Sequence, residues 1–446
     1  MRFERQCFLE LVETTASKAL RHSFFAERAA AKIPDLPSDT PAREIRLAGI
    51  VGAGTMGTGI ATAFANAGID VLLTDASAEA LERGMAGIRA QYDSGVARQR
   101  LTRQAADQRL ARIRPAAGLE AMRGADLVIE AVFEDLALKQ DVFRRLEEVV
   151  ADSALIATNT STLDVDAIAG VLRHPGRSLG LHFFSPAAVM RLLEVVRGQA
   201  TAPAALVTAL GLARRLRKVP VVARVCDGFI GNRMFEEYLR EAYAAVEEGA
   251  LPHEVDAALE EFGFAMGPFR VMDLAGQDIG WAIRRRLAVA RPDRRYAAWP
   301  DRLCERGRFG LKTGRGVYRY APGSRSPERD PEVESVIVAL SAERGIHRRA
   351  VPAEEIVERC VDALIDEGAR ILEEGIALRA SDIDVVWLTG YGFPLYRGGP
   401  MFHADTVGTT KVAAAIAKRR AAAGAGAEPV APLLARLAAT GGRFNA

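Results

Sequence analysis

Cysteine and histidine are scarce in this chain, whose 446 residues include 4 Cys and 6 His. No two cysteines are close enough in sequence to form a zinc knuckle or a C-x-x-C pair, so we expect free thiols in a reducing compartment and no resident metal. Net charge is also nearly absent, because 59 basic residues face 57 acidic ones and leave +2 at neutral pH. This balance argues against a protein whose whole surface binds nucleic acid.

The sequence also lacks the marks of secretion and of membrane insertion. Residues 1–10, MRFERQCFLE, contain neither the apolar core nor the small-residue cleavage site of a signal peptide. The longest apolar stretch, residues 47–69, is full of glycine, and we do not interpret it as a membrane span. We therefore expect a soluble, cytoplasmic protein, in which 49% hydrophobic residues are enough to form sizeable cores.

Short apolar runs alternate with helical patterns from Ile45 to about Arg224. Near-continuous apolar strands that are separated by helices are typical of a parallel sheet covered on both faces. The runs expected to form strands are IRLAGIVG, IDVLLTD, ADLVIEAV, SALIATN, SLGLHFF, LLEVV and VPVVAR, which start at residues 45, 69, 125, 153, 178, 192 and 219.

The first of these runs leads into a glycine-rich turn that is typical of dinucleotide-binding proteins. Gly52, Gly54 and Gly57 form G-x-G-x-x-G between an apolar strand and an Ala-rich helix. The first glycine allows the tight turn, the second lets a pyrophosphate approach the backbone, and the third lets helix and strand pack closely. Asp75 ends the second strand, where an acid binds ribose hydroxyls and repels a 2′-phosphate. The pattern predicts NAD rather than NADP; the alternative is an ordinary Gly-rich turn.

Together these patterns predict an α/β Rossmann-like NAD-binding domain followed by two mostly α-helical repeat domains, with an N-terminal linker-like helix. The apolar face of that helix needs cover, so we expect residues 1–32 to pack on the rest of the chain. The expected segments are a helix with a Pro-rich linker (1–44), the NAD-binding domain (45–225), a first helical domain (226–320), a linker (321–351) and a second, degenerate helical domain (352–446).

The two helical regions look like a repeat. Residues 235–276 and 361–408 share Glu-Glu-Gly, Gly-Phe and Gly-Pro steps and an Asp shortly before a final Gly. Duplicated helical units usually pack on one another to bury a shared face. In our alignment Glu358 of the second repeat stands where the first repeat has Asn232, and we therefore expect the second repeat to be structural.

A histidine and a carboxylate interrupt two of the apolar runs. His182 ends SLGLHFF, and Glu194 lies inside LLEVV. A carboxylate in a buried strand is costly unless it is paired and hydrogen-bonded, so we interpret His182 as the partner of Glu194. If the carboxylate accepts the Nδ1 proton, Nε2 is free to act as a base. The alternative is a histidine that is simply packed in the core.

Other polar residues lie at or near the carboxyl ends of strands, where open α/β sheets bind ligands. Glu134 and Lys139 follow one strand, with a solvated helix start as the alternative. Ser161 follows another strand within TNTST, where the alternative is capping of the next helix. Asn232 lies among apolar residues in GFIGNRMF, with a helix-capping or interdomain hydrogen bond as the alternative.

Six segments follow one another in the order and at the spacing of (3S)-3-hydroxyacyl-CoA dehydrogenases: VGAGTMGTGIA, VIEAVFEDLALK, TNTSTL, GLHFFSP, LLEVV and DGFIGNR. The chain resembles this family from about Ile45 to Tyr320. With its second helical region it resembles the dehydrogenase half of multifunctional fatty-acid β-oxidation enzymes. Residues 15–32 resemble the helix that joins an enoyl-CoA hydratase domain to the dehydrogenase in those enzymes, and the hydratase domain has no counterpart in this sequence.

The resemblance implies NAD-dependent oxidation of a 3-hydroxyacyl-CoA to a 3-oxoacyl-CoA, or the reverse. It implies that His182 is the catalytic base and Glu194 its partner. It also implies that Ser161 binds the 3-hydroxyl and that Asn232 holds the substrate near the nicotinamide. The family usually has Asn where this chain has Ser185, so a hydroxyl replaces an amide there. The positions that match cofactor contacts are Gly52, Gly54, Met56, Gly57, Asp75, Val132, Glu134, Lys139, Ser161 and Ser185.

The implied partners are an acyl-CoA substrate and a separate enoyl-CoA hydratase or thiolase, and we expect a monomer or homodimer. Arginines in residues 284–295 could hold the CoA phosphates, with a solvated basic face as the alternative. Two other functions stay open. A dehydrogenase of small free β-hydroxy acids would be expected to use a lysine base, which is missing at the Asn232 position. A non-catalytic assembly subunit of a β-oxidation complex would have no need of the His182 and Glu194 pair.

Overall fold

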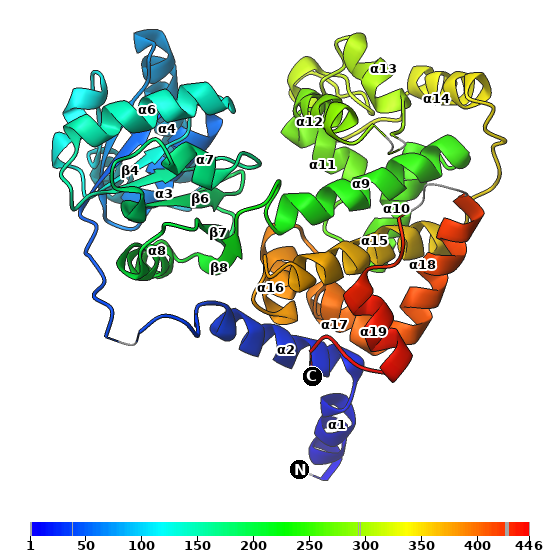
Figure 1. Cartoon of the computed structure of the whole chain (residues 1–446). Helices are drawn as coiled ribbons and strands as arrows, with labels where there is room; N and C mark the ends of the chain where they lie inside the picture. Colours follow the sequence, from blue (N-terminus) through cyan, green and yellow to red (C-terminus); the bar gives the residue numbers. More distant parts are fainter. Residues whose placement is uncertain (1, 38, 293, 295, 424–427, 446) are drawn as a thin grey trace. The chain divides into compact units, whose positions relative to one another are not determined.

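An eight-stranded sheet lies at the centre of the segment in which apolar runs alternate with helical patterns (Figure 1). The computed structural model describes residues 2–37, 39–292, 294, 296–423 and 428–445. The strand order is β3-β2-β1-β4-β5-β6-β7-β8. The strands are β1 (Leu47–Val51), β2 (Asp70–Thr74), β3 (Ile113–Pro115), β4 (Leu127–Glu130), β5 (Leu155–Thr158), β6 (Ser178–Phe183), β7 (Leu192–Arg197) and β8 (Val219–Arg224).

The sheet is parallel apart from the pairing of β6 with β7, which is antiparallel. The apolar runs predicted to be strands contain β1, β2 and β4 to β8. The antiparallel pair differs from the parallel sheet that we expected. Only residues 184–191 connect β6 to β7, and a parallel connection needs a longer crossover. The short strand β3 was not predicted, because its residues do not form an apolar run.

Helices cover both faces of the sheet. Successive residues of a strand point to opposite faces, so they pack against different sets of helices. Ile50 packs among apolar residues of α3, α4, α5 and α8, whereas its neighbour Val51 packs among those of η1, α6 and α7. The bounds are α3 (Thr55–Asn66), α4 (Ala78–Ala97), α5 (Arg103–Leu110), η1 (Leu119–Gly124), α6 (Leu136–Val149), α7 (Val165–Ala169), η2 (Pro175–Arg177) and α8 (Pro203–Arg215).

The chain divides into two compact units. The sheet unit comprises His22–Asn232 and Glu374–Tyr391, and the helical unit comprises Met1–Arg21, Arg233–Glu373 and Gly392–Ala446. Helix α16 (Ala380–Gly390) therefore belongs to the sheet unit, although it comes from the second predicted repeat. It packs on β7 and β8. The second repeat thus supplies an element of the sheet unit.

The second half of α2 (Thr15–Ala30) is tied to the sheet unit. Ala26 and Ala30 are 3% and 1% exposed, and His22 Nε2 lies 2.8 Å from Asp384 Oδ2 on α16. This half of α2 therefore packs on the rest of the chain, as we expected for residues 1–32. Helix α1 (Arg2–Val12) differs from this expectation, because it exposes the large apolar side chains of Phe3, Phe8, Leu9 and Leu11.

The helical unit contains α1 and helices of both predicted repeats. Helix α14 lies inside the segment that we interpreted as a linker. Within the described residues, no helix combines the length and the apolar composition needed to cross a membrane. The remaining bounds are α9 (Gly231–Glu248), α10 (Pro252–Phe262), α11 (Pro268–Ala275), α12 (Gln277–Ala290), α13 (Trp299–Glu305), η3 (Leu311–Thr313), α14 (Pro331–Glu343), α15 (Ala353–Glu373), η4 (Leu395–Arg397), α17 (Pro400–Val407), α18 (Thr409–Ala423) and α19 (Pro432–Thr440).

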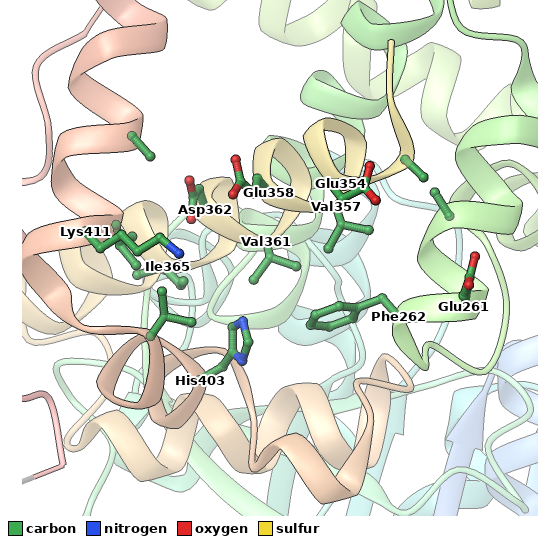
Figure 2. A pocket seen from close by; sticks show the side chains of 15 residues that line it. Glu261, Phe262, Glu354, Val357, Glu358, Val361, Asp362, Ile365, His403 and Lys411 are labelled. Atoms are coloured by element: carbon green, nitrogen blue, oxygen red, sulfur yellow. The ribbon is translucent and has the colours of Figure 1, made fainter. Parts of the chain in front are cut away.

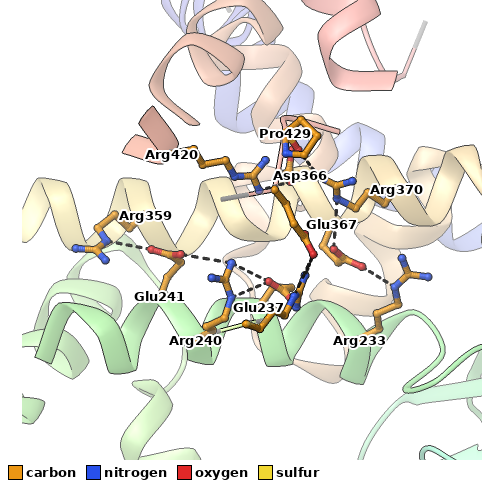
Figure 3. A network of polar contacts seen from close by, with 12 residues as sticks. Arg233, Glu237, Arg240, Glu241, Arg359, Asp366, Glu367, Arg370, Arg420 and Pro429 are labelled. Carbon is orange, nitrogen blue, oxygen red and sulfur yellow. Dashed lines mark hydrogen bonds and ion pairs between the residues drawn. The ribbon is translucent and has the colours of Figure 1, made fainter. Parts of the chain in front are cut away.

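Ion pairs join α9 to α15 in the helical unit (Figure 3). Arg233 Nε lies 2.5 Å from Glu367 Oε1, and Arg359 Nε lies 3.1 Å from Glu241 Oε2. Arg240 extends the network, because its Nη2 lies 3.6 Å from Glu241 Oε1. A guanidinium group does not lose its proton in proteins, so the arginines of this network stay charged and hold the two helices together.

Candidate functional site

The loop between β1 and α3 leaves open space at the N-terminus of a helix. Gly52 has a φ of +107°, and a Cβ at Gly57 would lie 1.8 Å from the Gly52 carbonyl oxygen, so neither position accepts a side chain without strain. At Gly54 an added Cβ would meet no described atom within 4 Å, and no described side chain caps α3. The free N–H groups and the helix dipole can therefore bind a phosphate.

Asp75 lies at the carboxyl end of β2, beside this loop. Its Oδ2 accepts a hydrogen bond of 2.7 Å from the N–H of Ala53, and its Oδ1 accepts one of 3.1 Å from the N–H of Ser77. The remaining lone pairs of the carboxylate can accept from ribose hydroxyls, and its charge disfavours a 2′-phosphate. The open glycine turn, the uncapped helix and this carboxylate fit NAD.

A buried ion pair lies at the carboxyl end of β4. The side chains of Glu130 and Lys139 are 0% and 1% exposed, and Lys139 Nζ lies 2.8 Å from Glu130 Oε1. The hydroxyl of Thr158 and the N–H of Val132 each donate to Glu130 at 2.7 Å. Glu130 thus binds the Lys139 ammonium and the Val132 N–H. Both residues were predicted to contact the cofactor. Glu130 was not predicted, although it interrupts an apolar run in the same way as Glu194.

Glu134 connects this ion pair to the loop after β5. Its Oε2 lies 3.3 Å from Lys139 Nζ. Its Oε1 accepts hydrogen bonds of 2.6 Å from the Thr160 hydroxyl and 2.8 Å from the N–H of Ser161. Burial acts to raise the pKa of Glu134, but the Lys139 ammonium and these hydrogen bonds outweigh it and hold the pKa below its usual value. The ionised carboxylate therefore orders the loop that carries Ser161.

His182 and Glu194 face each other across β6 and β7. They are direct partners in the antiparallel register, and His182 Nδ1 lies 2.7 Å from Glu194 Oε2. His182 is 5% exposed and Glu194 is 0% exposed. Cross-strand partners present their side chains on the same face of a sheet, which explains why the two groups meet. The structure thus brings together the two residues that we expected to pair.

Two backbone N–H groups hold the other oxygen of Glu194. Its Oε1 accepts hydrogen bonds of 3.2 Å from Ile230 and 2.9 Å from Gly231, at the start of α9. The partial positive charge at a helix N-terminus also favours a carboxylate there. Because an ionised carboxylate only accepts hydrogen bonds, Nδ1 of His182 must donate, which leaves the lone pair of the neutral ring on Nε2.

Asn232 and Ser161 meet in the sheet unit, together with a tyrosine from the second repeat. Asn232 Nδ2 donates to the carbonyl oxygen of Ser161 at 3.3 Å, and the Tyr391 hydroxyl donates to Asn232 Oδ1 at 2.7 Å. The Phe184 ring centroid lies 4.3 Å from that of His182 and 5.5 Å from that of Tyr391. Tyr391 was not predicted, because we expected its repeat to be structural. The signal in the sequence was its place in GYGFPLYRGGP, residues 390–400, within the region that resembles multifunctional enzymes.

Two further predicted residues lie near these groups in sequence. Met56 is half-buried in the first turn of α3, and Ser185 is exposed two residues after the end of β6. Among the arginines proposed for CoA phosphates, Arg284 and Arg294 form ion pairs within the helical unit, whereas Arg285, Arg286 and Arg291 are exposed. Arg284 is 5% exposed and its Nε lies 2.6 Å from Asp301 Oδ1, which fits neither a free phosphate ligand nor a solvated face. Residues 293 and 295 of that segment lie outside the described residues.

Glu358, the counterpart of Asn232 in the second repeat, lines a pocket of about 390 Å³ in the helical unit (Figure 2). Much of the lining is apolar, as at Val357 and Val361. Burial lowers the pKa of His403, which points into this pocket, to about 4, so its ring is neutral at physiological pH. The predicted catalytic residues all belong to the sheet unit and do not line this pocket.

Two family descriptions match most of the chain. The family described as 3-hydroxyacyl-CoA dehydrogenase, NAD binding domain, matches residues 47–226. The one described as 3-hydroxyacyl-CoA dehydrogenase, C-terminal domain, matches residues 228–320 and 356–444. The peroxisomal bifunctional enzyme of Danio rerio is 43% identical over 427 residues, which cover 92% of this chain and 59% of that protein. The chain therefore spans less than two thirds of the length of this relative.

Two solved structures with the same fold match this chain over nearly all of their own length. The 3-hydroxybutyryl-CoA dehydrogenase of Escherichia coli has a TM-score of 0.76 and 30% identity, covering 89% of this chain and 99% of that one. The dehydrogenase part of multifunctional enzyme 1 from C. elegans has a TM-score of 0.67 and 26% identity, covering 93% of this chain and 96% of that one.

Proposed function

The chain belongs to the 3-hydroxyacyl-CoA dehydrogenase family, and from this premise we propose that it catalyses the NAD-dependent oxidation of (3S)-3-hydroxyacyl-CoA to 3-oxoacyl-CoA and the reverse reduction. The observation that carries the proposal is the hydrogen bond of 2.7 Å between His182 Nδ1 and Glu194 Oε2. Such a pair provides a base whose orientation is set by a buried carboxylate.

His182 is the proposed general base. Its Nε2 accepts the proton of the 3-hydroxyl during oxidation and returns it during reduction, while Glu194 stabilises the imidazolium through the Nδ1–H bond. Positioned acid–base catalysis of this kind contributes about 10²–10⁴-fold to a rate. Bound NAD supplies the hydride chemistry at C3 of the substrate.

Ser161 and Asn232 are the proposed substrate-binding residues. The Ser161 hydroxyl lies 3.2 Å from Glu134 Oε1 and donates to it. Because this O–H can rotate, we assign it to the oxygen of the 3-hydroxyl group, whose hydrogen goes to His182 Nε2. The Asn232 amide has a second N–H beyond the one directed at Ser161, and we assign it to an oxygen of the substrate near the nicotinamide.

The cofactor site is proposed at the carboxyl ends of β1, β2, β4 and β5. The N-terminus of α3 would hold the pyrophosphate, and Asp75 would hold the adenine ribose. Glu134 keeps the loop after β5 in place beside the cofactor. The full proposed set is Gly52, Gly54, Met56, Gly57, Asp75, Val132, Glu134, Lys139, Ser161 and Ser185.

A substrate panel tests the proposal. We expect the protein to oxidise NADH in the presence of acetoacetyl-CoA at a rate far above that with free acetoacetate, because the family is defined by acyl-CoA substrates. Equal rates would favour a dehydrogenase of small free β-hydroxy acids. No NADH oxidation with 3-oxoacyl-CoAs of any chain length would contradict the proposal and favour a non-catalytic assembly subunit.

Partners and location are proposed on the same basis. We propose an acyl-CoA substrate from fatty-acid β-oxidation, because the matching relative of Oryza sativa is named a peroxisomal fatty acid beta-oxidation multifunctional protein. A separate enoyl-CoA hydratase or thiolase would supply this substrate or consume the product, and the chain would act as a monomer or homodimer. Cytoplasmic location stays a prediction, since the names of matching relatives place them in peroxisomes or glyoxysomes.

A further inference from the structure

We infer that Tyr391, from the second repeat, is a positioning residue that orients the Asn232 carboxamide toward the substrate; this inference rests on the proposed function. The Tyr391 hydroxyl donates to Asn232 Oδ1 at 2.7 Å, and Asn232 Nδ2 donates to the Ser161 carbonyl oxygen at 3.3 Å. The Ser161 carbonyl oxygen selects this orientation of the amide because it can only accept, and the Tyr391 hydroxyl then holds the amide by donating to its oxygen. A reversed amide would place two carbonyl oxygens against each other at Ser161.

The contact at Tyr391 is the shorter of the two, so its loss leaves the amide held only by the longer bond to Ser161. The correct orientation matters because an amide has donors at one end and an acceptor at the other. With Nδ2 beside Ser161, the remaining N–H of Asn232 can donate to a substrate oxygen. After a flip, a lone pair would face that oxygen instead and repel it.

Packing fixes the position of the Tyr391 ring. The ring stacks on that of Trp387, with centroids 4.7 Å apart, and meets the ring of Phe184 edge-on at 5.5 Å. Gly231 makes room for it, because a Cβ there would lie 2.5 Å from Tyr391 Cε2. Gly390 lets the end of α16 approach β7, because a Cβ there would lie 2.4 Å from Leu192 Cδ2. The hydroxyl is therefore held in place by groups of the same unit.

Residues from both repeats thus contribute to the same proposed substrate-binding group in the sheet unit. The first repeat carries Asn232, and the second carries the residue that orients it, although its own counterpart of Asn232 is Glu358. Tyr391 also continues an aromatic row that starts at the base, since Phe184 contacts both His182 and Tyr391. The second repeat therefore contributes more than structural support.

A double-mutant cycle with Tyr391→Phe and Asn232→Ala tests the inference. Phenylalanine keeps the ring contacts and removes only the hydroxyl. Loss of one neutral hydrogen bond predicts a fall in kcat/KM for acetoacetyl-CoA of about 10-fold. In the Asn232→Ala background the same change should cost less than about 2-fold, because nothing remains to be oriented. Tyr396→Phe is the matched control, since its hydroxyl donates to the Phe262 carbonyl oxygen at 3.0 Å in the helical unit.

Binding supplies a readout that does not depend on turnover. Acetoacetyl-CoA and NAD⁺ cannot react with each other, so calorimetry can measure acetoacetyl-CoA binding in the presence of NAD⁺. We expect Tyr391→Phe to weaken this binding and to leave NADH binding unchanged. An equal cost of Tyr391→Phe in both backgrounds, as a general folding defect would give, overturns the inference. So does a loss below 2-fold in the otherwise unaltered protein. An inactive unaltered protein overturns the proposed function instead, and the inference with it.

Discussion

Both units of this protein bury charged side chains, but they use them differently. In the sheet unit, Glu194 is fully buried and pairs with a histidine. In the helical unit, Arg359 is nearly buried and pairs with Glu241 and Glu248 at 3.1 and 2.7 Å. An imidazole can gain and lose a proton near neutral pH, whereas a guanidinium cannot. Burial of charge therefore does not by itself identify a catalytic site. The partner of the buried charge must also be able to gain and lose a proton.

The backbone groups that compensate buried charges also differ between the two units. Backbone N–H groups of Ile230 and Gly231 hold Glu194, so its position depends on the backbone and not on a second charged side chain. In the helical unit, Arg348 donates to the carbonyl oxygens of Val246, Gly249 and Ala250 at the C-terminal end of α9. That arrangement satisfies carbonyls left free by a helix end, which is a structural role.

The largest expected effect is on turnover in the sheet unit. His182→Ala should lower kcat for acetoacetyl-CoA reduction by about 10²–10⁴-fold, because it removes the proposed general base. His174→Ala is the matched control, since His174 is an exposed histidine of the same unit. Steady-state NADH oxidation measures both variants, and circular dichroism checks that they fold. Near-normal turnover of His182→Ala would contradict the difference between a catalytic buried pair in the sheet unit and a structural one in the helical unit.

Next in size is the effect of a methyl group in the glycine turn. Gly54→Ala should fold normally, because the added Cβ meets no described atom within 4 Å, but it should weaken NADH binding. We expect a loss of about 10-fold or more, since the methyl group occupies the space of the pyrophosphate. Gly57→Ala should instead lower stability, because its Cβ would lie 1.8 Å from a backbone oxygen. Fluorescence titration and thermal unfolding separate the two outcomes; unchanged NADH affinity of Gly54→Ala would place the phosphates elsewhere.

A smaller effect is expected in the helical unit, and on stability alone. Arg359→Met should lower the free energy of unfolding by about 2–3 kcal/mol, because the partly buried Glu241 and Glu248 lose their closest cation and keep only longer contacts to Arg240 and Arg349. The exposed Arg103, which pairs with Asp93, provides the control, and Arg103→Met should change the free energy of unfolding far less than Arg359→Met does. Urea unfolding measures both. A matching loss of kcat/KM per folded molecule in Arg359→Met would show that this network also serves catalysis.

The smallest effect concerns Glu134, and it depends on pH. Its pKa is lowered in the folded state, so its ionised form stabilises the loop above the unfolded value of 4.5. This contribution is lost as the pH falls through the lower, folded value. The difference in unfolding temperature between the unaltered protein and Glu134→Gln should therefore be present at pH 7 and shrink as the pH falls below 4.5. A difference that is constant from pH 7 to the acid limb would show that the charge of Glu134 does not order the loop.

Much of the sheet could be predicted, because strands buried on both faces must be apolar and such runs are visible in the chain. The pair of His182 and Glu194 could be predicted from the cost of burying a carboxylate. Glu130 carried the same signal, but its partner Lys139 lies in the following helix and not in a neighbouring apolar strand. Tyr391 could not be found in this way, because its contact with Asn232 joins positions 159 residues apart and depends on how α16 packs.

One pair of isosteric substitutions tests the central difference most directly. Glu194→Gln and Glu241→Gln make the same chemical change, one beside His182 in the sheet unit and one beside Arg359 in the helical unit. We predict that Glu194→Gln lowers kcat/KM for acetoacetyl-CoA by at least about 100-fold, and that Glu241→Gln stays within about 2-fold per folded molecule. Equal losses in the two variants, or normal activity of Glu194→Gln, would contradict the account.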